Sequence, residues 1–153
     1  MQMANILKKV EDSPLIQVPQ LPPHIRTNRY ITKSICYHAA NMANEINAKA
    51  ISTLTNSGYT AFQISAWRPL SHILVFTSNK RILTQLSLLW GVRAFYYDKF
   101  VSTDETIEDV NNIACKMGYL EVGDMLISLA AMPIQSKGMV NTLRVTEITS
   151  CPI

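Results

Sequence analysis

The sequence has few of the features that mark membrane, nucleic-acid-binding or metal proteins. Every apolar run is shorter than ten residues and therefore too short to cross a bilayer, and no signal peptide is visible. Basic residues are scattered, with no run longer than Lys8-Lys9, so the net charge of +3 does not indicate nucleic acid. The three histidines, His24, His38 and His72, lack carboxylates or cysteines at metal-ligand spacing. We therefore expect no nucleic acid, no membrane and no metal among the partners of this chain.

Cysteine is also scarce, and no two of the three cysteines have Cys-x-x-Cys spacing. Cys36, Cys115 and Cys151 are far apart, a pattern that predicts reduced thiols in a cytoplasmic protein. With 48% hydrophobic and 16% charged residues, the 153-residue chain is long enough to bury about two thirds of its unfolded surface in one core. We therefore expect a conventional globular domain that needs no disulfide.

The first 27 residues differ from the rest and predict a connector. Residues 1–12 have a helical pattern, whereas residues 13–23 are rich in proline and extended. The sequence pattern of residues 28–153 predicts a single domain.

Strands and helices alternate in that domain. A helix over 28–47 carries an apolar stripe whose small residues, Ala39, Ala40 and Ala43, permit close approach of another element or of a second subunit. The later predicted elements are strand 49–54, helix 58–66, strand 72–77, helix 80–89, strand 92–97, helix 103–117, strand 124–130 and strand 140–148. Such alternation predicts a parallel sheet, and the absence of a helix between the last two strands predicts an antiparallel hairpin.

Right-handed crossovers around a central first strand define the expected fold class. It is α/β, a three-layer α/β/α sandwich with a five-stranded, mostly parallel sheet in the order 3-2-1-4-5 and an antiparallel last strand. The order reverses beside the first strand, and ligands of open α/β sheets bind beyond the carboxyl ends of the strands at such a reversal. The turn 55–60 and the loop 131–139 both follow strands at this point.

The turn after the first strand carries groups that bind anions. It offers three hydroxyls, an amide side chain, a permissive glycine and the unpaired amides of a helix start. The residues are Thr55, Asn56, Ser57, Gly58, Tyr59 and Thr60. No Gly-Lys-Ser/Thr follows and only one glycine is present, so the turn is neither a Walker loop nor a dinucleotide fingerprint. Ser136, Lys137 and Gly138 can close over the same ligand, although a plain helix cap and a solvated lysine remain open as alternatives.

Several short motifs occur together in a familiar order. They are Ala48-Lys49-Ala50-Ile51, Thr55-x-Ser57-Gly58-x-Thr60, Arg68-Pro69, Thr77-x-Asn79, Gly91-Val92, Gly123-Asp124 and Gly138-x-x-Asn141-Thr142-Leu143-Arg144-Val145. Over residues 28–148 the chain thereby resembles the carboxyl-terminal regulatory domain of pyruvate kinase.

The resemblance implies a domain attached to its own catalytic barrel, in a glycolytic enzyme that transfers phosphate from phosphoenolpyruvate to ADP with Mg²⁺ and K⁺. The family's catalytic residues and metal ligands lie in the barrel. The resemblance therefore implies no catalytic residue and no cofactor here, and a fragment without kinase activity of its own. It also implies a homo-oligomer assembled through these domains.

In the family, the turn that matches 55–60 holds an effector phosphate, and the loop that matches 133–139 covers the sugar. Members that bind fructose 1,6-bisphosphate hold its second phosphate with a tryptophan and an arginine near the helix that matches 103–117. This helix has neither and begins with Asp104 and Glu105, so we expect a sugar monophosphate or a nucleoside monophosphate instead. A free-standing small-molecule phosphate-binding protein and a purely structural assembly domain are the alternative functions.

Overall fold

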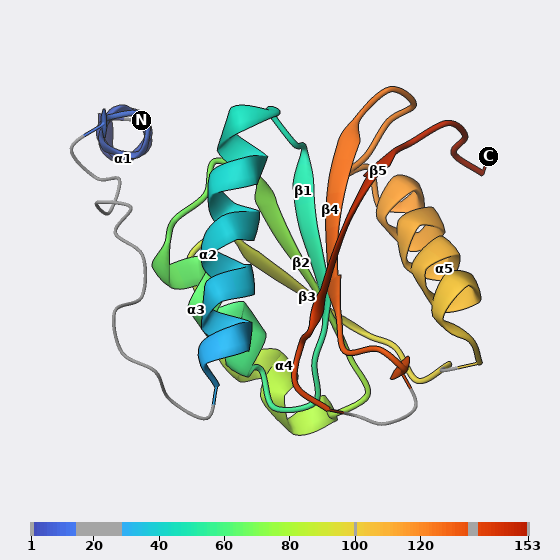
Figure 1. The fold of residues 1–153 in the computed structure, drawn as a ribbon. Coiled ribbons are helices and arrows are strands. Elements are labelled where there is room, and N and C mark those ends of the chain that lie inside the picture. Colours follow the sequence, from blue (N-terminus) through green and yellow to red (C-terminus); the bar gives the residue numbers. More distant parts are fainter. Residues whose placement is uncertain (1, 15–28, 100, 135–137, 153) are drawn as a thin grey trace.

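The structure is a computed structural model that describes residues 2–14, 29–99, 101–134 and 138–152 (Figure 1). Its elements follow the expected alternation of strands and helices. In chain order they are α1 (Gln2–Glu11), α2 (Tyr30–Glu45), β1 (Ala50–Leu54), α3 (Tyr59–Ala66), β2 (His72–Thr77), α4 (Lys80–Leu86), β3 (Val92–Tyr96), α5 (Thr103–Lys116), β4 (Met125–Ala130) and β5 (Thr142–Glu147).

The five strands form one sheet in the order β3-β2-β1-β4-β5. Strand β1 lies between β2 and β4 and is parallel to both, and β3 is parallel to β2. Strand β5 is antiparallel to β4, from the pair Met125 and Glu147 to the pair Ala130 and Thr142. The predicted fold class and strand order are confirmed.

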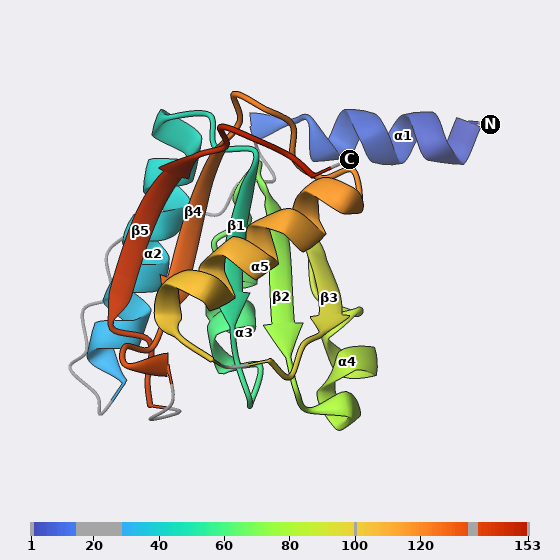
Figure 2. The same cartoon turned by 90° about the vertical axis from the view of Figure 1, so that its right-hand side faces the viewer.

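Helices cover both faces of the sheet, with α2, α3 and α4 on one side and α5 on the other (Figures 1 and 2). Because successive strand residues point to opposite faces and both faces are covered, β1, β2 and β4 are buried at nearly every position. Ile73 and Val75 of β2 belong to the core beneath α2 and α3, whereas Leu74 and Phe76 belong to the core beneath α5. The sheet thus separates two apolar cores.

Helix α2 ends two residues earlier than predicted. Asn47 adopts a positive φ of 52°, and the Ala48 N–H binds the Ala43 carbonyl at 2.9 Å, which closes the helix. Ala39, Ala40 and Ala43 are at most 1% exposed, inside the domain. Their predicted availability to a second subunit is therefore wrong, because the sheet and α3 already occupy the space that their small side chains leave.

Helix α4 is shorter than the predicted helix over 80–89. It begins with Asn79, whose side chain accepts from the Arg81 N–H, and it ends at Leu86. The Ser87 hydroxyl donates to the Leu83 carbonyl at 3.0 Å and satisfies a terminal acceptor. Leu88 continues the apolar spacing of this helix in the sequence, and the predicted helix was therefore too long. In the structure Leu88 is 87% exposed and does not pack on the sheet.

The prediction of three reduced thiols is wrong for two of them. Cys115, near the end of α5, forms a disulfide with Cys151 in the segment after β5, and their Cα atoms are 5.6 Å apart. The two residues are 36 positions apart in sequence, so spacing alone carried no sign of the pairing. Cys36 is a buried free thiol.

Helix α1 has no buried residue. Residues 15–28, which include most of the predicted connector after this helix, lie outside the described residues, and the proposed division of the chain at residue 27 stays a prediction. Within the described ranges, no helix combines the length and apolar character needed to cross a membrane.

Candidate functional site

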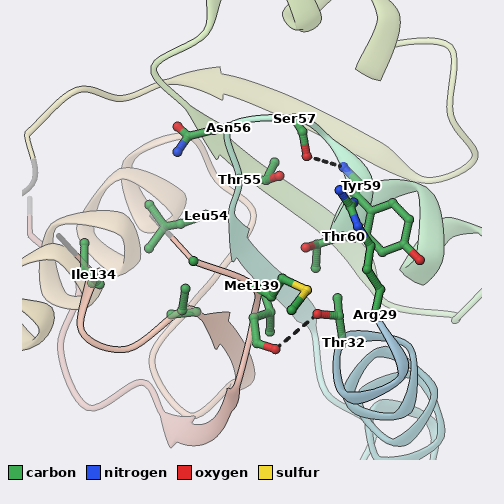
Figure 3. Close-up of a pocket in the computed structure, with 14 residues that line it drawn as sticks. Arg29, Thr32, Leu54, Thr55, Asn56, Ser57, Tyr59, Thr60, Ile134 and Met139 are labelled. Atoms are coloured by element: carbon green, nitrogen blue, oxygen red, sulfur yellow. Dashed lines mark hydrogen bonds between the residues drawn. The ribbon is translucent and has the colours of Figure 1, made fainter. Parts of the chain in front are cut away.

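A pocket of about 360 Å³ opens at the carboxyl end of β1, where the order of the sheet reverses (Figure 3). Three segments that are distant in sequence line it: the end of β1 with the following turn, the start of α2, and the connection from β4 to β5. The lining residues are Arg29, Thr32, Leu54, Thr55, Asn56, Ser57, Tyr59, Thr60, Ala130, Ala131, Ile134, Gly138, Met139 and Val140.

The structure gathers most of the residues that the sequence singled out. Every residue of the predicted turn 55–60 lines the pocket except Gly58, and Gly138 of the predicted loop lines it too. Ser136 and Lys137 lie outside the described residues. The binding role of these residues stays a prediction.

The turn 55–60 is held by its own side chains. The Thr55 hydroxyl accepts from the Gly58 N–H at 3.0 Å, and the Ser57 hydroxyl accepts from the Tyr59 N–H at 3.4 Å. Gly58 has a φ of 80°, the left-handed region that glycine adopts without strain, and its carbonyl receives the Phe62 N–H at the start of α3. Each hydroxyl acts here as an acceptor and donates to no residue that the structure describes, so its own hydrogen is available to a ligand.

Further donors at the start of α3 have no partner. In the part of the chain that the structure describes, the N–H groups of Thr60 and Ala61 and the Thr60 hydroxyl make no hydrogen bond. Thr60 is only 5% exposed and its hydroxyl points into the pocket (Figure 3). Unpaired amides at a helix start and the unpaired hydroxyl of a buried residue together form a site suited to an anion.

The turn after β2 supports the first turn from the side. The Asn79 side chain donates to the Asn56 carbonyl at 3.1 Å, and the Ser78 hydroxyl donates to the Asn56 side chain at 3.4 Å. Asn56, predicted as a ligand residue, therefore has its side-chain oxygen engaged with the neighbouring turn. Its main effect in this structure is to fix the two turns against each other.

Arg29 is a residue that the sequence analysis missed. It precedes α2, and its guanidinium carbon lies 4.2 Å from the centre of the Tyr59 ring, in a cation–π contact. Figure 3 shows the side chain extending from α2 along that ring toward the start of α3. Among the described lining residues Arg29 alone is charged. No local pattern in the sequence signals this placement, because it depends on how α2 packs beside α3.

The opposite wall of the pocket is apolar. Leu54, Ile134 and Met139 lie across from the polar turn in Figure 3. The Thr32 hydroxyl of α2 donates to the Val140 carbonyl at 3.3 Å and joins the helix to the end of this wall. The pocket therefore offers a polar, positively charged side and an apolar side, as expected for a phosphate attached to an organic group.

No carboxylate among the described residues lines the pocket. Asp104 is 89% exposed and forms an ion pair with Arg144 at 3.0 Å, and neither it nor Glu105 lines the pocket. No carboxylate, histidine or cysteine occurs among the described lining residues, so they include no general base or thiol nucleophile. The described residues also contain no group of three His, Cys, Asp or Glu that could hold a metal ion, and we derive no metal chemistry from them.

The fold and the pocket together define an open-sheet α/β domain with a hydroxyl- and amide-lined site at the switch point. The family model described as "Pyruvate kinase, alpha/beta domain" matches residues 33–146. The chain belongs to this family, that of the carboxyl-terminal α/β domain of pyruvate kinase.

Individual relatives agree with the family assignment. The chain is 34% identical over 122 residues to a pyruvate kinase of Clostridium acetobutylicum, a match that covers 80% of this chain and 25% of that protein. A pyruvate kinase of Lactococcus lactis is 31% identical over 146 residues, which cover 95% of this chain and 29% of that protein. The chain thus spans between a quarter and a third of the length of these two relatives.

A solved structure is similar in fold. The crystal structure of a pyruvate kinase from Cryptosporidium parvum superposes with a TM-score of 0.71 at 24% sequence identity, over 82% of this chain and 24% of that chain. This likeness supports the sheet order and the layering of the helices.

Proposed function

We propose that this domain binds the phosphate of a small effector at the turn 55–60, and that it regulates and assembles a pyruvate kinase without catalysing a reaction itself. The effector would be a sugar phosphate or a nucleoside monophosphate. The observation that carries the proposal is the hydroxyl of the buried residue Thr60, which points into the switch-point pocket without a partner among the described residues, beside the unpaired amides of α3.

The composition of the pocket supports an anion that carries an organic group. Its volume of about 360 Å³ falls within the range of small-molecule sites. One side supplies hydroxyls, amides and Arg29, and the other supplies apolar side chains. An anion binds on the first side, and the sugar or the nucleoside packs against the second.

The start of α5 supports one phosphate rather than two. Asp104 and Glu105 occupy its first turn, and Arg144 is already paired with Asp104. Both carboxylates lie outside the pocket lining, and Asp104 is exposed, so they would repel only a second phosphate that reached the first turn of α5. A bisphosphate whose second phosphate reaches that turn therefore gains less from this pocket than a monophosphate does.

Catalysis, in this proposal, belongs to a barrel of the same enzyme. That barrel would transfer phosphate from phosphoenolpyruvate to ADP with Mg²⁺ and K⁺, as a cytoplasmic homo-oligomer. Effector binding would act by shifting the population of two arrangements of the subunits, because a ligand changes activity only through different affinities for the two states.

Isothermal titration of the 153-residue chain with glucose 6-phosphate, AMP and inorganic phosphate tests the binding. Glucose and adenosine, which lack the phosphate, serve as ligand controls. Thr60→Val removes the unpaired hydroxyl at nearly constant shape and should weaken phosphate binding roughly tenfold with little effect on stability. Thr146→Val is the matched control, because the Thr146 hydroxyl is also unpaired among the described residues but is buried in β5 outside the pocket.

The outcomes separate the candidate functions. Absence of binding at millimolar concentrations would overturn the effector proposal and leave a structural assembly domain. Equal binding of glucose and glucose 6-phosphate would show that the turn does not recognise phosphate. Sedimentation of the chain with and without ligand then measures its contribution to assembly.

A further inference from the structure

The position of Arg29 conflicts with the usual placement of charge on helices. Cations stabilise the carboxyl ends of helices, where the helix dipole is negative, and are less favourable at the amino ends. Arg29 nevertheless extends along Tyr59, the first residue of α3, toward the positive end of that helix (Figure 3). A local reason is needed for a cation in this place.

Neighbouring protein groups do not supply that reason. No carboxylate occurs among the described residues that line the pocket, and the Arg29 guanidinium makes no ion pair or hydrogen bond to any residue the structure describes. Its described contact is the stack on Tyr59 at 4.2 Å. Stacking uses the face of the guanidinium and leaves the N–H groups at its edge free to bind an anion.

A solvated arginine that rests on an aromatic ring is the simplest alternative. The pocket distinguishes the two interpretations, because three further donors stand beside it without partners. Thr60 is a buried residue whose hydroxyl is directed into the same space, and the amides of Thr60 and Ala61 lie at the start of the same helix. An anion in that space removes the unfavourable charge arrangement and satisfies all of these donors at once.

We infer that Arg29 is a phosphate-binding and specificity residue, which Tyr59 holds in position beside the start of α3. This inference rests on the proposed effector site and names its ligand class as phosphate monoesters in the dianionic form. The guanidinium binds two phosphate oxygens through its edge, and the Thr60 hydroxyl and the α3 amides bind the remaining oxygen. The tryptophan and arginine that hold a second phosphate in some family members are absent from α5. Arg29 instead supplies a positive charge at the first phosphate.

The second charge of the ligand gives the inference its specificity. A phosphate monoester carries close to two negative charges at pH 7, whereas a sulfate ester of similar shape carries one. A site with a neutral donor set alone would distinguish the two weakly. A site with an arginine at hydrogen-bonding distance favours the dianion, because the charge-assisted bonds are stronger.

Titration of the 153-residue chain with glucose 6-phosphate and glucose 6-sulfate tests the inference. Arg29→Gln should weaken glucose 6-phosphate roughly ten- to hundredfold and glucose 6-sulfate less, so that the preference for phosphate falls. Lys33→Gln is the matched control: it removes one positive charge one turn along α2 outside the pocket lining, and should change either affinity by no more than about twofold. Arg29→Lys keeps the charge but loses the planar fork, and should give an intermediate affinity.

Three results would count against the inference in distinguishable ways. If the unmodified chain binds neither compound, the proposed effector site fails and the inference with it. If Arg29→Gln and Lys33→Gln weaken glucose 6-phosphate equally, Arg29 acts only through net charge, and the inference is wrong while the effector site stands. If Arg29→Gln lowers both affinities by the same factor, Arg29 does not select the dianion.

Thermal unfolding of each variant checks the fold. Tyr59→Leu, which removes the stacked ring, should reproduce part of the loss of glucose 6-phosphate affinity seen in Arg29→Gln.

Discussion

Asn141 holds the backbone of Met132 from both sides. Its side-chain oxygen accepts from the Met132 N–H at 2.8 Å, and its side-chain nitrogen donates to the Met132 carbonyl at 2.8 Å. The two residues lie at opposite ends of the connection from β4 to β5. This pair of bonds fixes the base of the loop that forms the apolar wall of the pocket.

Asn141→Ala should open this loop locally. The variant loses the two bonds to Met132 and the bond that the Asn141 side-chain oxygen accepts from the Thr142 hydroxyl at 2.9 Å. At this exposed position the loss is expected to cost about 1 kcal/mol in urea unfolding and to remove the hydrogen-exchange protection of the Met132 amide. Asn141→Asp keeps the acceptor for the Met132 N–H but loses the donor and places a carboxylate at the Met132 carbonyl, so it should lose a similar unfolding free energy while keeping part of the Met132 amide protection. Thr149→Ala, at an exposed site with no side-chain bond among the described residues, is the control. Unchanged Met132 protection in Asn141→Ala would contradict the role of this pair.

Gly58→Ala should disturb the turn through both backbone strain and crowding. Gly58 has a φ of 80°, and an added Cβ would lie 3.2 Å from the Leu86 side chain. Gly118→Ala separates the two effects, because Gly118 has a φ of 81° with no atom within 4 Å of such a Cβ. Both variants should lose about 1–2 kcal/mol of unfolding free energy from strain, and Gly58→Ala should lose more. Only Gly58→Ala should weaken glucose 6-phosphate in titration.

Two results would contradict this account of Gly58. Equal destabilisation of the two variants would mean that Leu86 moves aside without cost. Unchanged glucose 6-phosphate binding in Gly58→Ala would mean that the shape of the turn does not matter for the ligand.

The fold could be predicted because its causes are local in sequence. The apolar run from Ile73 to Phe76 specifies a strand buried on both faces, and Ser102 with Glu105 marks the start of α5. The handedness of the crossovers then leaves few strand orders, and the switch point follows from the order. The turn 55–60 was found in this way.

The remaining features depend on contacts between distant segments. Arg29 reaches the pocket only because α2 packs beside α3, and Asn141 meets Met132 only because the β4–β5 connection folds back on itself. Cys115 and Cys151 approach each other through the packing of α5 beside the segment after β5. Periodicity and motif spacing carry no information about such approaches, which is why these contacts were not predicted.

The Cys115–Cys151 disulfide predicts a fixed pattern of alkylation. In strong denaturant without reductant, iodoacetamide should modify Cys36 alone, and with reductant it should modify all three cysteines, as intact mass would show. Because the bond closes a long segment, reduction should lower the free energy of unfolding by up to about 3–4 kcal/mol in the chain-entropy treatment. The variant with Cys115→Ser and Cys151→Ser should match the reduced protein and be insensitive to reductant. Three modified cysteines without reductant would show that the bond is absent in solution.

The buried thiol of Cys36 should make the protein less stable at high pH. Burial raises the pKa of its thiol from 9.0 to about 12, so the folded state keeps the proton at pH values where the unfolded chain has lost it. The unfolded state then binds fewer protons than the folded state between pH 9 and 12, and stability falls as pH rises through this window. Between pH 8 and 10 the unmodified protein should lose about 1.4 kcal/mol more unfolding free energy than Cys36→Ala. Urea unfolding of both proteins at the two pH values measures the difference, in which the tyrosines common to both cancel. Parallel losses in the two proteins would mean that the Cys36 thiol ionises equally in both states and is not buried in solution.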